Sequence, residues 1–176
     1  VAERKGREHR DQLEQYQRLK LAETRVEDLL RDFSARLELD RSLEQERQGG
    51  FLRKDGKLAA FALIKGHLPS PLPGGRVKSV FGRVFDPKSG LQVFRKGIDL
   101  EGGKNFPIRS IFGGKVAYAG DLPGYGPAVI VDHGDHYYTL MARLGRVQRV
   151  VGDKVSAGDP IGETDSAANP VYFEIR

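Results

Sequence analysis

Few side chains of this 176-residue sequence are suited to binding a metal or acting as a nucleophile. The sequence has no Cys, which excludes disulfides, thiolate zinc sites, iron–sulfur clusters and cysteine catalysis. Its four histidines, a small supply for any metal site, are His9, His67, His133 and His136. Its glycines neither precede Lys-Ser or Lys-Thr nor open a helix, so no phosphate-binding loop is expected. The sequence therefore offers little for metal-based or nucleophilic catalysis.

A series of short motifs in the second half of the sequence is more informative. In chain order the motifs are RKGIDL at 95–100, GKVAYAG at 114–120, GYG at 124–126, VIVDHG at 129–134, YT at 138–139, GDKV at 152–155, GDPIG at 158–162 and YFEIR at 172–176. Each motif is weak alone, but their order over about a hundred residues is specific. Across residues 76–176 the sequence resembles the LytM (lysostaphin-type) zinc metallopeptidases of bacterial cell-wall metabolism.

The resemblance implies a zinc site whose ligands this sequence lacks. Active family members bind zinc through a His two residues before the Gly of the Gly-Ile-Asp segment and through that Asp, and a final His-x-His before Phe-Glu-Ile supplies the third ligand and a catalytic His. The first two positions hold Arg95 and Asp99 here, and Pro170 and Tyr172 replace the two histidines of the His-x-His. A further family His is replaced by Arg143, and arginine stays protonated and does not ligate metals. We therefore expect no enzyme activity, no metal and no cofactor.

A LytM domain without its catalytic residues resembles the murein hydrolase activators of the EnvC type. The segment at 63–72 and the closing YFEIR support this closer resemblance. It implies a periplasmic protein of a Gram-negative envelope at the division site. Its LytM domain would bind and activate a zinc-dependent N-acetylmuramoyl-L-alanine amidase during cell separation. The family's coiled coil would dock on an FtsEX-type transporter, and this sequence has only one charged helix before Gly49.

The former active-site groove is the expected binding surface for the amidase. The candidate groove residues are Arg95, Lys96, Asp99, Tyr125, Met141, Arg143 and Tyr172. Asp99 has two interpretations that remain open here. It either serves as a structural partner of Arg95 and Arg143, or lines a groove that binds a protein, since Arg and Tyr are enriched in interfaces.

Two other functions compete with amidase activation. A basic groove could instead bind peptidoglycan directly, which would make the domain a cell-wall-binding module. A residual zinc endopeptidase is the third hypothesis. Nucleic acid is not an expected partner, because the Lys and Arg residues are scattered and no RNA-binding motif is present.

The composition divides the sequence into two parts, and their helices and strands must position the candidate groove residues. Residues 1–48 have 11 basic and 12 acidic residues (net −1), one Gly and no Pro, whereas residues 49–176 have 18 basic and 12 acidic residues (net +6). No run of 18 apolar residues exists, so no transmembrane segment is expected. Because the sequence begins with Val and lacks a charged-then-apolar leader, we expect a mature or trimmed fragment.

The first part has the pattern of an amphipathic helix from residue 11 to 48. Its apolar residues recur at spacings of three and four: Leu19, Ala22, Val26, Leu30, Phe33 and Leu37. We expect Val26, Leu30, Phe33 and Leu37 to form a regulatory face. The helix is either a coiled-coil remnant or an inhibitory arm that covers the groove.

The second part has the pattern of short strands separated by glycine turns. The clearest strand-like runs are 76–81, 115–119, 128–132, 137–142, 147–151 and 171–175. We predict a mainly β fold, a LytM-like antiparallel sandwich or flattened barrel preceded by the α-helical arm. The expected division is an arm at 1–50, a junction at 51–75 with a short helix and three prolines, and a β domain at 76–176.

Overall fold

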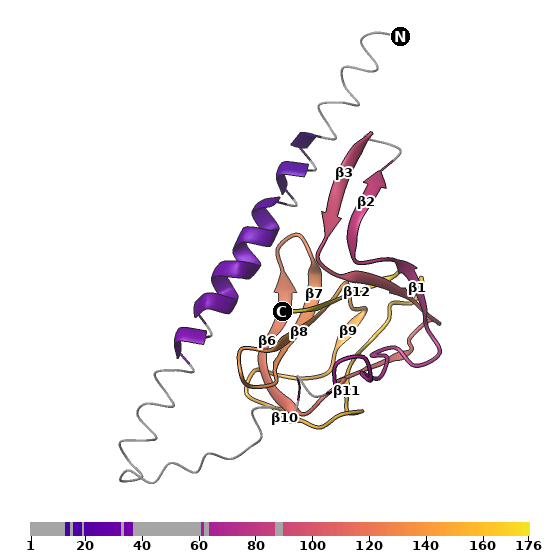
Figure 1. Ribbon diagram of the computed structural model, residues 1–176. Coiled ribbons are helices and arrows are strands. Elements are labelled where there is room, and N and C mark those ends of the chain that lie inside the picture. The colour runs from indigo at the N-terminus through magenta and orange to yellow at the C-terminus, as the bar shows by residue number, and fades with distance from the viewer. Residues whose placement is uncertain are drawn as a thin grey trace. The chain divides into compact units, whose positions relative to one another are not determined.

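The computed structural model describes residues 13–14, 16–18, 20–32, 34–36, 61, 64–86 and 90–176 (Figure 1). The chain divides into two compact units, Val1–Lys57 and Leu58–Arg176. We call the second unit the β-domain. The division falls inside the segment 51–75 that the sequence marks as a junction, and each unit is treated by itself below.

All described residues of the first unit between 13 and 36 are helical. The side chains of Thr24 and Ser34 donate hydrogen bonds to the carbonyls four residues earlier, at 3.1 and 3.0 Å. Val26 and Leu30 are four residues apart and therefore share a helix face with Ala22. Phe33 and Leu37, the other two residues of the predicted regulatory face, lie outside the described residues. No helix among the described residues is long and apolar enough to cross a membrane.

The β-domain is built from short strands, as the glycine spacing predicts. Within the described residues these are β1 (Arg76–Ser79), β2 (Gly82–Asp86), β3 (Leu91–Arg95), β4 (Ile98–Glu101), β5 (Pro107–Arg109), β6 (Gly114–Leu122), β7 (Gly126–Asp132), β8 (Tyr138–Ala142), β9 (Arg146–Val147), β10 (Lys154–Val155), β11 (Pro160–Glu163) and β12 (Val171–Ile175). β9 ends at Val147, earlier than the expected run 147–151, because Val150 and Val151 lie in an exposed turn.

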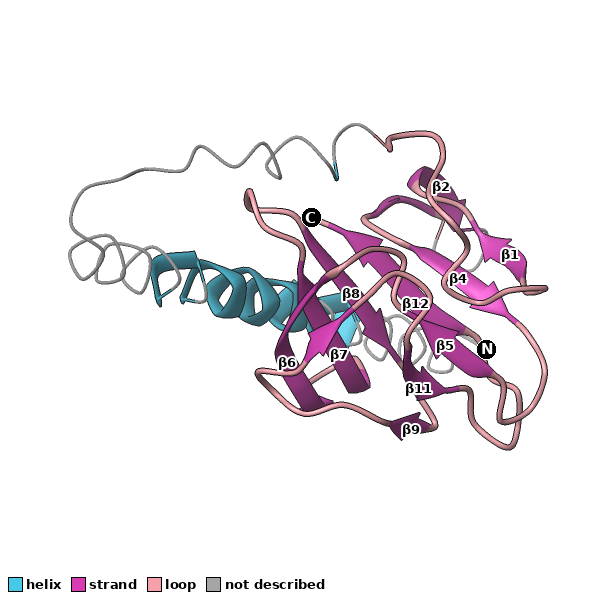
Figure 2. Ribbon diagram, turned by 90° about the horizontal axis from the view of Figure 1, so that it is seen from below, coloured by secondary structure: helices cyan, strands magenta, loops and turns pink. Residues whose placement is uncertain are grey.

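The strands form three antiparallel sheets (Figures 1 and 2). The largest has the order β1-β4-β12-β8-β7-β6-β10, a smaller one has the order β5-β11-β9, and β2 pairs with β3 as a separate hairpin. One core cluster joins the two larger sheets, since it contains Ile108 of β5 and Ile161 of β11 together with Val129 and Phe173 of the large sheet. The predicted mainly β, antiparallel architecture is confirmed.

Strand register decides which side chains of the large sheet face the core. Phe173 pairs with Ile98 on one side and with Met141 on the other, and Met141 pairs with Val129. Of these four residues, Phe173, Met141 and Val129 belong to the buried core, and Ile98 packs against it. Because successive residues of a strand point to opposite faces, the neighbouring row must point away from the core. That row contains Asp99 and Tyr172, and we call its side of the sheet the Tyr172 face.

His133 anchors the start of the β-domain rather than binding a ligand. Its Nδ1–H donates to the carbonyl of Gly113 at 2.9 Å, and its Nε2 accepts from the hydroxyl of Thr139 at 2.8 Å. The imidazole stacks on Phe61 with ring centroids 4.9 Å apart. Burial lowers the pKa of His133, although the Gly113 carbonyl and the carboxylate of Asp132 oppose that shift. The neutral imidazole is therefore the form that fits this packing.

The His133 environment predicts a loss of stability in mild acid. A folded-state pKa below the unfolded value of about 6.5 means that the unfolded chain binds more protons as the pH falls. The stabilising contribution should be complete above about pH 6.5 and should decrease as the pH falls toward the lowered pKa. Urea denaturation between pH 7.5 and 5 should show this decrease in the free energy of unfolding. The slope should flatten in His133→Gln and persist in His67→Gln, an exposed control; equal slopes in all three proteins would contradict the prediction.

Candidate functional site

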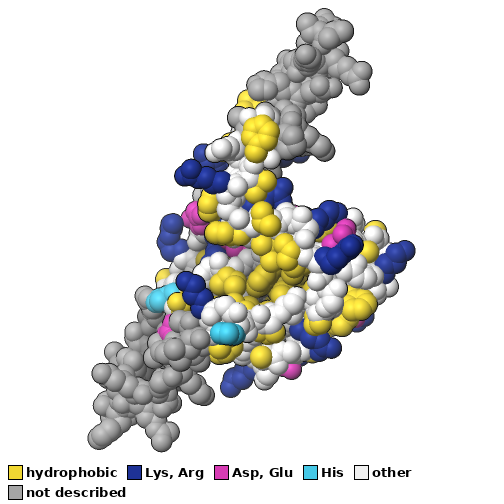
Figure 3. Space-filling model, turned by 45° about the vertical axis from the view of Figure 1, so that its right-hand side comes forward, with side chains coloured by type: hydrophobic (Ala, Val, Ile, Leu, Met, Phe, Trp, Pro, Cys, Tyr) yellow, Lys and Arg dark blue, Asp and Glu magenta, His cyan; other side chains and the backbone are white. Residues whose placement is uncertain are grey.

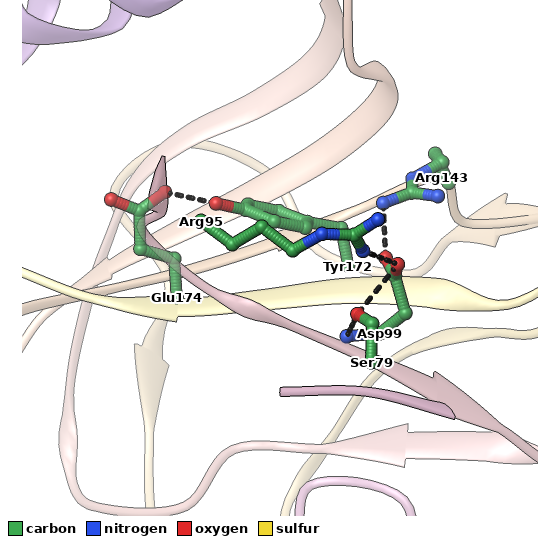
Figure 4. Close-up of polar contacts among 6 residues, drawn as sticks. All are labelled: Ser79, Arg95, Asp99, Arg143, Tyr172 and Glu174. Carbon is green, nitrogen blue, oxygen red and sulfur yellow. Dashed lines mark hydrogen bonds and ion pairs between the residues drawn. The ribbon is translucent and has the colours of Figure 1, made fainter. Parts of the chain in front are cut away.

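Asp99 is the centre of a hydrogen-bonded ion cluster at the edge of the Tyr172 face (Figure 4). Its Oδ2 accepts hydrogen bonds from Arg95 Nη1 at 3.2 Å and from the hydroxyl of Ser79 at 2.8 Å. Its Oδ1 accepts a short hydrogen bond from Arg143 Nη2. The backbone N–H of Asp99 in turn donates to the Ser79 hydroxyl at 2.9 Å. We call Ser79, Arg95, Asp99 and Arg143 the Asp99 cluster.

The local backbone brings the two arginines to the same carboxylate. Arg95 is the last residue of β3 and Asp99 is the second residue of β4, so a short turn separates them. Arg143 follows β8 with φ at 60°, a left-handed conformation that costs an arginine on the order of 1 kcal/mol. Its backbone N–H donates to the carbonyl of Tyr125 at 3.1 Å, which stabilises that conformation. The ion pairs thus depend on turn geometry as much as on charge.

Tyr172 lies beside the cluster but points its hydroxyl elsewhere. The hydroxyl donates to Glu174 Oε2 at 2.7 Å, away from Asp99 (Figure 4). Glu174 is 3% exposed and also accepts from Arg176 Nε at 2.6 Å. Burial, and then the charge of Glu174, raises the pKa of Tyr172 far above its usual range. At neutral pH the hydroxyl is therefore a fixed proton donor and not a tyrosinate.

Aromatic and guanidinium groups cover the rest of this region. The Tyr172 ring centroid lies 5.4 Å from that of Tyr125 and 5.4 Å from Arg143 Cζ, within the range of a cation–π contact. The Arg95 and Arg143 side chains are 44% and 45% exposed, whereas Asp99 is 16% exposed. The surface at the Asp99 cluster therefore consists of half-exposed guanidinium groups above a shielded carboxylate.

The turn between β3 and β4 needs glycine at position 97. A Cβ at Gly97 would lie 2.4 Å from the carbonyl oxygen of Phe173 and 2.6 Å from Cζ of Tyr172. Both distances are far below van der Waals contact, so any larger residue would push β4 away from β12 or displace the Tyr172 ring. Gly97 thus holds the Asp99 cluster and Tyr172 in register.

The structure brings together most of the residues that the sequence marks as a groove. Arg95, Asp99 and Arg143 are in direct contact, and Tyr125 and Tyr172 adjoin them. Lys96 lies in the turn that follows Arg95.

The assignment of Met141 to the groove is wrong. Met141 is 1% exposed and belongs to the core cluster, because it lies on the opposite face of the sheet from Tyr172. Sequence reasoning missed Ser79 and Gly97. Nothing in the sequence links Ser79 to a residue 20 positions away, whereas Gly97 lies within the RKGIDL motif.

Comparison with known proteins identifies the fold. Residues 93–176 match the model of Peptidase family M23. This region is therefore similar to M23-type (LytM-type) domains. The catalytic domain of the prophage-encoded M23 protein EnpA from Enterococcus faecalis superposes with a TM-score of 0.50 at 25% identity, over 62% of this chain and 84% of that one.

Two curated relatives come from Escherichia coli K12. The uncharacterized lipoprotein YgeR is 35% identical over 54% of this chain and 39% of its own length. The murein hydrolase activator NlpD is 33% identical over 54% of this chain and 26% of its own length. The matched region thus spans less than half of the length of either relative.

The residues of the M23-type domain do not fit the zinc ion that the peptidases of this fold bind. Catalytic zinc needs three neutral or anionic protein donors and an open position. Asp99 provides one carboxylate, but two guanidinium groups occupy its oxygens and repel a cation. Tyr172 keeps its proton, and no group of three or more His, Asp or Glu residues suited to a metal occurs in the described part of the chain.

The tight contact at Gly97 predicts a sharp difference between two glycine substitutions. Gly97→Ala should lower the free energy of unfolding by about 1–3 kcal/mol, the usual cost of overpacking. Gly113→Ala is the matched control, because the nearest atom to its Cβ would be the Val155 carbonyl oxygen at an ordinary 3.7 Å. Urea denaturation of both variants measures the difference, and equal stabilities would contradict the packing described for Gly97.

Proposed function

We propose that the β-domain is a non-catalytic activator of a zinc-dependent N-acetylmuramoyl-L-alanine amidase. One observation carries the proposal: the carboxylate at the position of a zinc ligand is held by two arginines. An M23-type domain whose ligand position is closed in this way is suited to binding and not to peptide cleavage. The similarity to NlpD, a murein hydrolase activator, supports the same function.

The Asp99 cluster and Tyr172 supply the chemistry expected of a protein-binding site. Two cations and one anion leave the cluster with a net charge of +1, and both guanidinium groups are half-exposed. Each can form further hydrogen bonds with a carboxylate of the partner while Asp99 keeps it in place. Arginine and tyrosine are also the residue types that contribute most to binding energy at interfaces. We propose that the amidase presents an acidic side chain to this cluster.

Activation by binding alone requires only a modest difference in affinity. If the amidase samples a minor active state, a domain that binds this state more tightly shifts the population toward it. Coupling free energies of about 1–3 kcal/mol correspond to roughly 5–150-fold changes. Such a mechanism needs no chemistry in the activator itself.

We further propose that the N-terminal helix inhibits the domain by competing for the Tyr172 face. The rows that continue from Tyr172 and Glu174 across the sheet are apolar: Ala142, Ala128, Leu140 and Ile130. The helix presents a matching apolar stripe that includes Ala22, Val26 and Leu30. An intramolecular ligand of this kind would have to leave before the amidase binds.

The setting of this activity is also a proposal. We propose that the protein acts in the periplasm at the division site, with an FtsEX-type transporter as the partner of a coiled coil, as the EnvC-type resemblance implies. The relative YgeR is a lipoprotein, which supports a location in the cell envelope.

Charge reversal in the Asp99 cluster tests the binding surface. Arg143→Glu places two carboxylates side by side, so we expect the affinity for the amidase to fall about tenfold or more. Arg146→Glu, an equal change of charge at an exposed β9 residue, should have little effect. Isothermal titration of the amidase with each variant measures the two affinities. Equal affinities would contradict the assignment, and strong binding to purified sacculi without amidase would favour a peptidoglycan-binding module.

A charge in the helix stripe tests the inhibitory role. Val26→Glu should weaken packing of the helix on an apolar surface and thus increase amidase activation several-fold. Leu21→Glu adds the same charge to the same helix outside the stripe and should leave activation unchanged. The measurement is the amidase rate at a fixed, subsaturating concentration of the full chain. Equal activation by both variants would exclude the helix as an inhibitor.

A further inference from the structure

The β2–β3 hairpin exposes a cluster of aromatic side chains that the Asp99 cluster does not explain. The two strands pair over five residue pairs and extend away from the large sheet (Figure 1). Phe85 is 62% exposed and Phe94 is 52% exposed, and Phe81, just before β2, is 62% exposed. Large exposed apolar patches on a folded domain indicate an interaction surface.

Two of the three phenylalanines are in ring contact with each other. In the register of the hairpin Arg83 pairs with Phe94, and Phe85 is two residues from Arg83, so these three side chains share one face. The rings of Phe81 and Phe94 meet edge to face, with centroids 5.5 Å apart. This ring contact restricts the Phe81 and Phe94 side chains, which lowers the conformational entropy they lose on binding. We call Phe81, Arg83, Phe85 and Phe94 the hairpin face.

The charge around the hairpin face is positive and partly compensated by carboxylates of the same domain. Residues 76–96 contain six basic residues and one acidic residue, a net charge of +5. Three of these cations already contact carboxylates of the domain: Arg76 and Lys78 with Glu101, and Arg95 with Asp99. Figure 3 shows hydrophobic side chains at the molecular surface with Lys and Arg side chains around them.

This arrangement favours a protein over a lipid surface. Attraction to an anionic membrane depends on uncompensated cations, and internal ion pairs reduce that attraction. The internal ion pairs leave the exposed aromatic area unchanged. An apolar centre with a charged rim is the usual anatomy of a protein interface.

The hairpin adjoins the candidate site in the chain. Phe94 precedes Arg95, the residue that contacts Asp99, and Gly82 of β2 pairs with Arg95. Because successive residues of a strand point to opposite faces, a partner that contacts both Arg95 and Phe94 extends from one face of β3 to the other. Because the net charge of 76–96 is positive, the complementary partner surface is an apolar patch edged by carboxylates.

We propose that the hairpin face is a second contact for the amidase, which binds an apolar patch bordered by acidic residues on that enzyme. This inference rests on the proposed function. The Asp99 cluster then selects a carboxylate of the partner, while Phe85 and Phe94 supply apolar contact area. Loss of the hairpin contact should weaken binding and leave the fold intact, because both rings are more than half exposed.

The test is isothermal titration of the amidase with the full chain carrying Phe85→Ser and Phe94→Ser together. We expect the dissociation constant to rise about tenfold or more. The matched control, Val150→Ser with Val151→Ser, removes two side chains that are 66% and 61% exposed in a distant turn, and should bind like the unaltered chain. Circular dichroism checks the fold, and Phe85→Ser alone replaces the double variant if that variant unfolds.

The outcomes separate the inference from the function on which it rests. Unaltered binding by the double variant overturns the hairpin contact and leaves the activator function standing. Failure of the unaltered chain to bind the amidase overturns both. Sedimentation with phosphatidylglycerol–phosphatidylethanolamine vesicles that is lost in the double variant, at unchanged amidase affinity, shows that the hairpin face binds lipid and overturns the inference.

Discussion

The bidentate capture of one carboxylate by two arginines determines what this domain is able to do. Asp99 stands where the LytM resemblance implies a metal ligand, yet Arg95 and Arg143 occupy its two oxygens and Ser79 fixes its orientation. Without the two cations the shielded carboxylate would have no charge partner, and without the carboxylate the two cations would repel each other. The three groups therefore depend on one another, and together they exclude a cation.

The fold supports this cluster through strand register. Asp99 pairs with Tyr172 across β4 and β12, and Phe173 and Ile98 of the next row turn inward to the core. A slip of one residue would bury the carboxylate and expose the phenylalanine, so the hydrophobic core and the site specify the same register. Gly97 permits the close approach that this register needs. The stability of the core thus maintains the geometry of a surface site.

Sequence periodicity was sufficient to predict the architecture, and the LytM resemblance implied the convergence of Arg95, Asp99 and Arg143 on one region. They were insufficient where contacts between residues far apart in the sequence determine which side chains belong to the site. Met141 and Tyr172 both belong to strands that approach the site, and only the pairing of β8 with β12 shows that Met141 turns inward. The contact of Ser79 with Asp99 joins strands 20 residues apart and leaves no local pattern. The hairpin was also missed, because Gly82 and Gly90 interrupt its alternation and its exposed phenylalanines resemble core residues in a linear sequence.

The central claim is that a metal centre has been replaced by an ion cluster, so that the domain activates an amidase instead of cutting peptidoglycan. Release of dye from labelled sacculi tests it most directly, with the chain alone, the amidase alone and the two together, each in the presence of zinc. The account predicts no release above buffer by the chain alone and roughly 5–150-fold more release by the pair than by the amidase alone. Zinc-dependent release by the chain alone would contradict it.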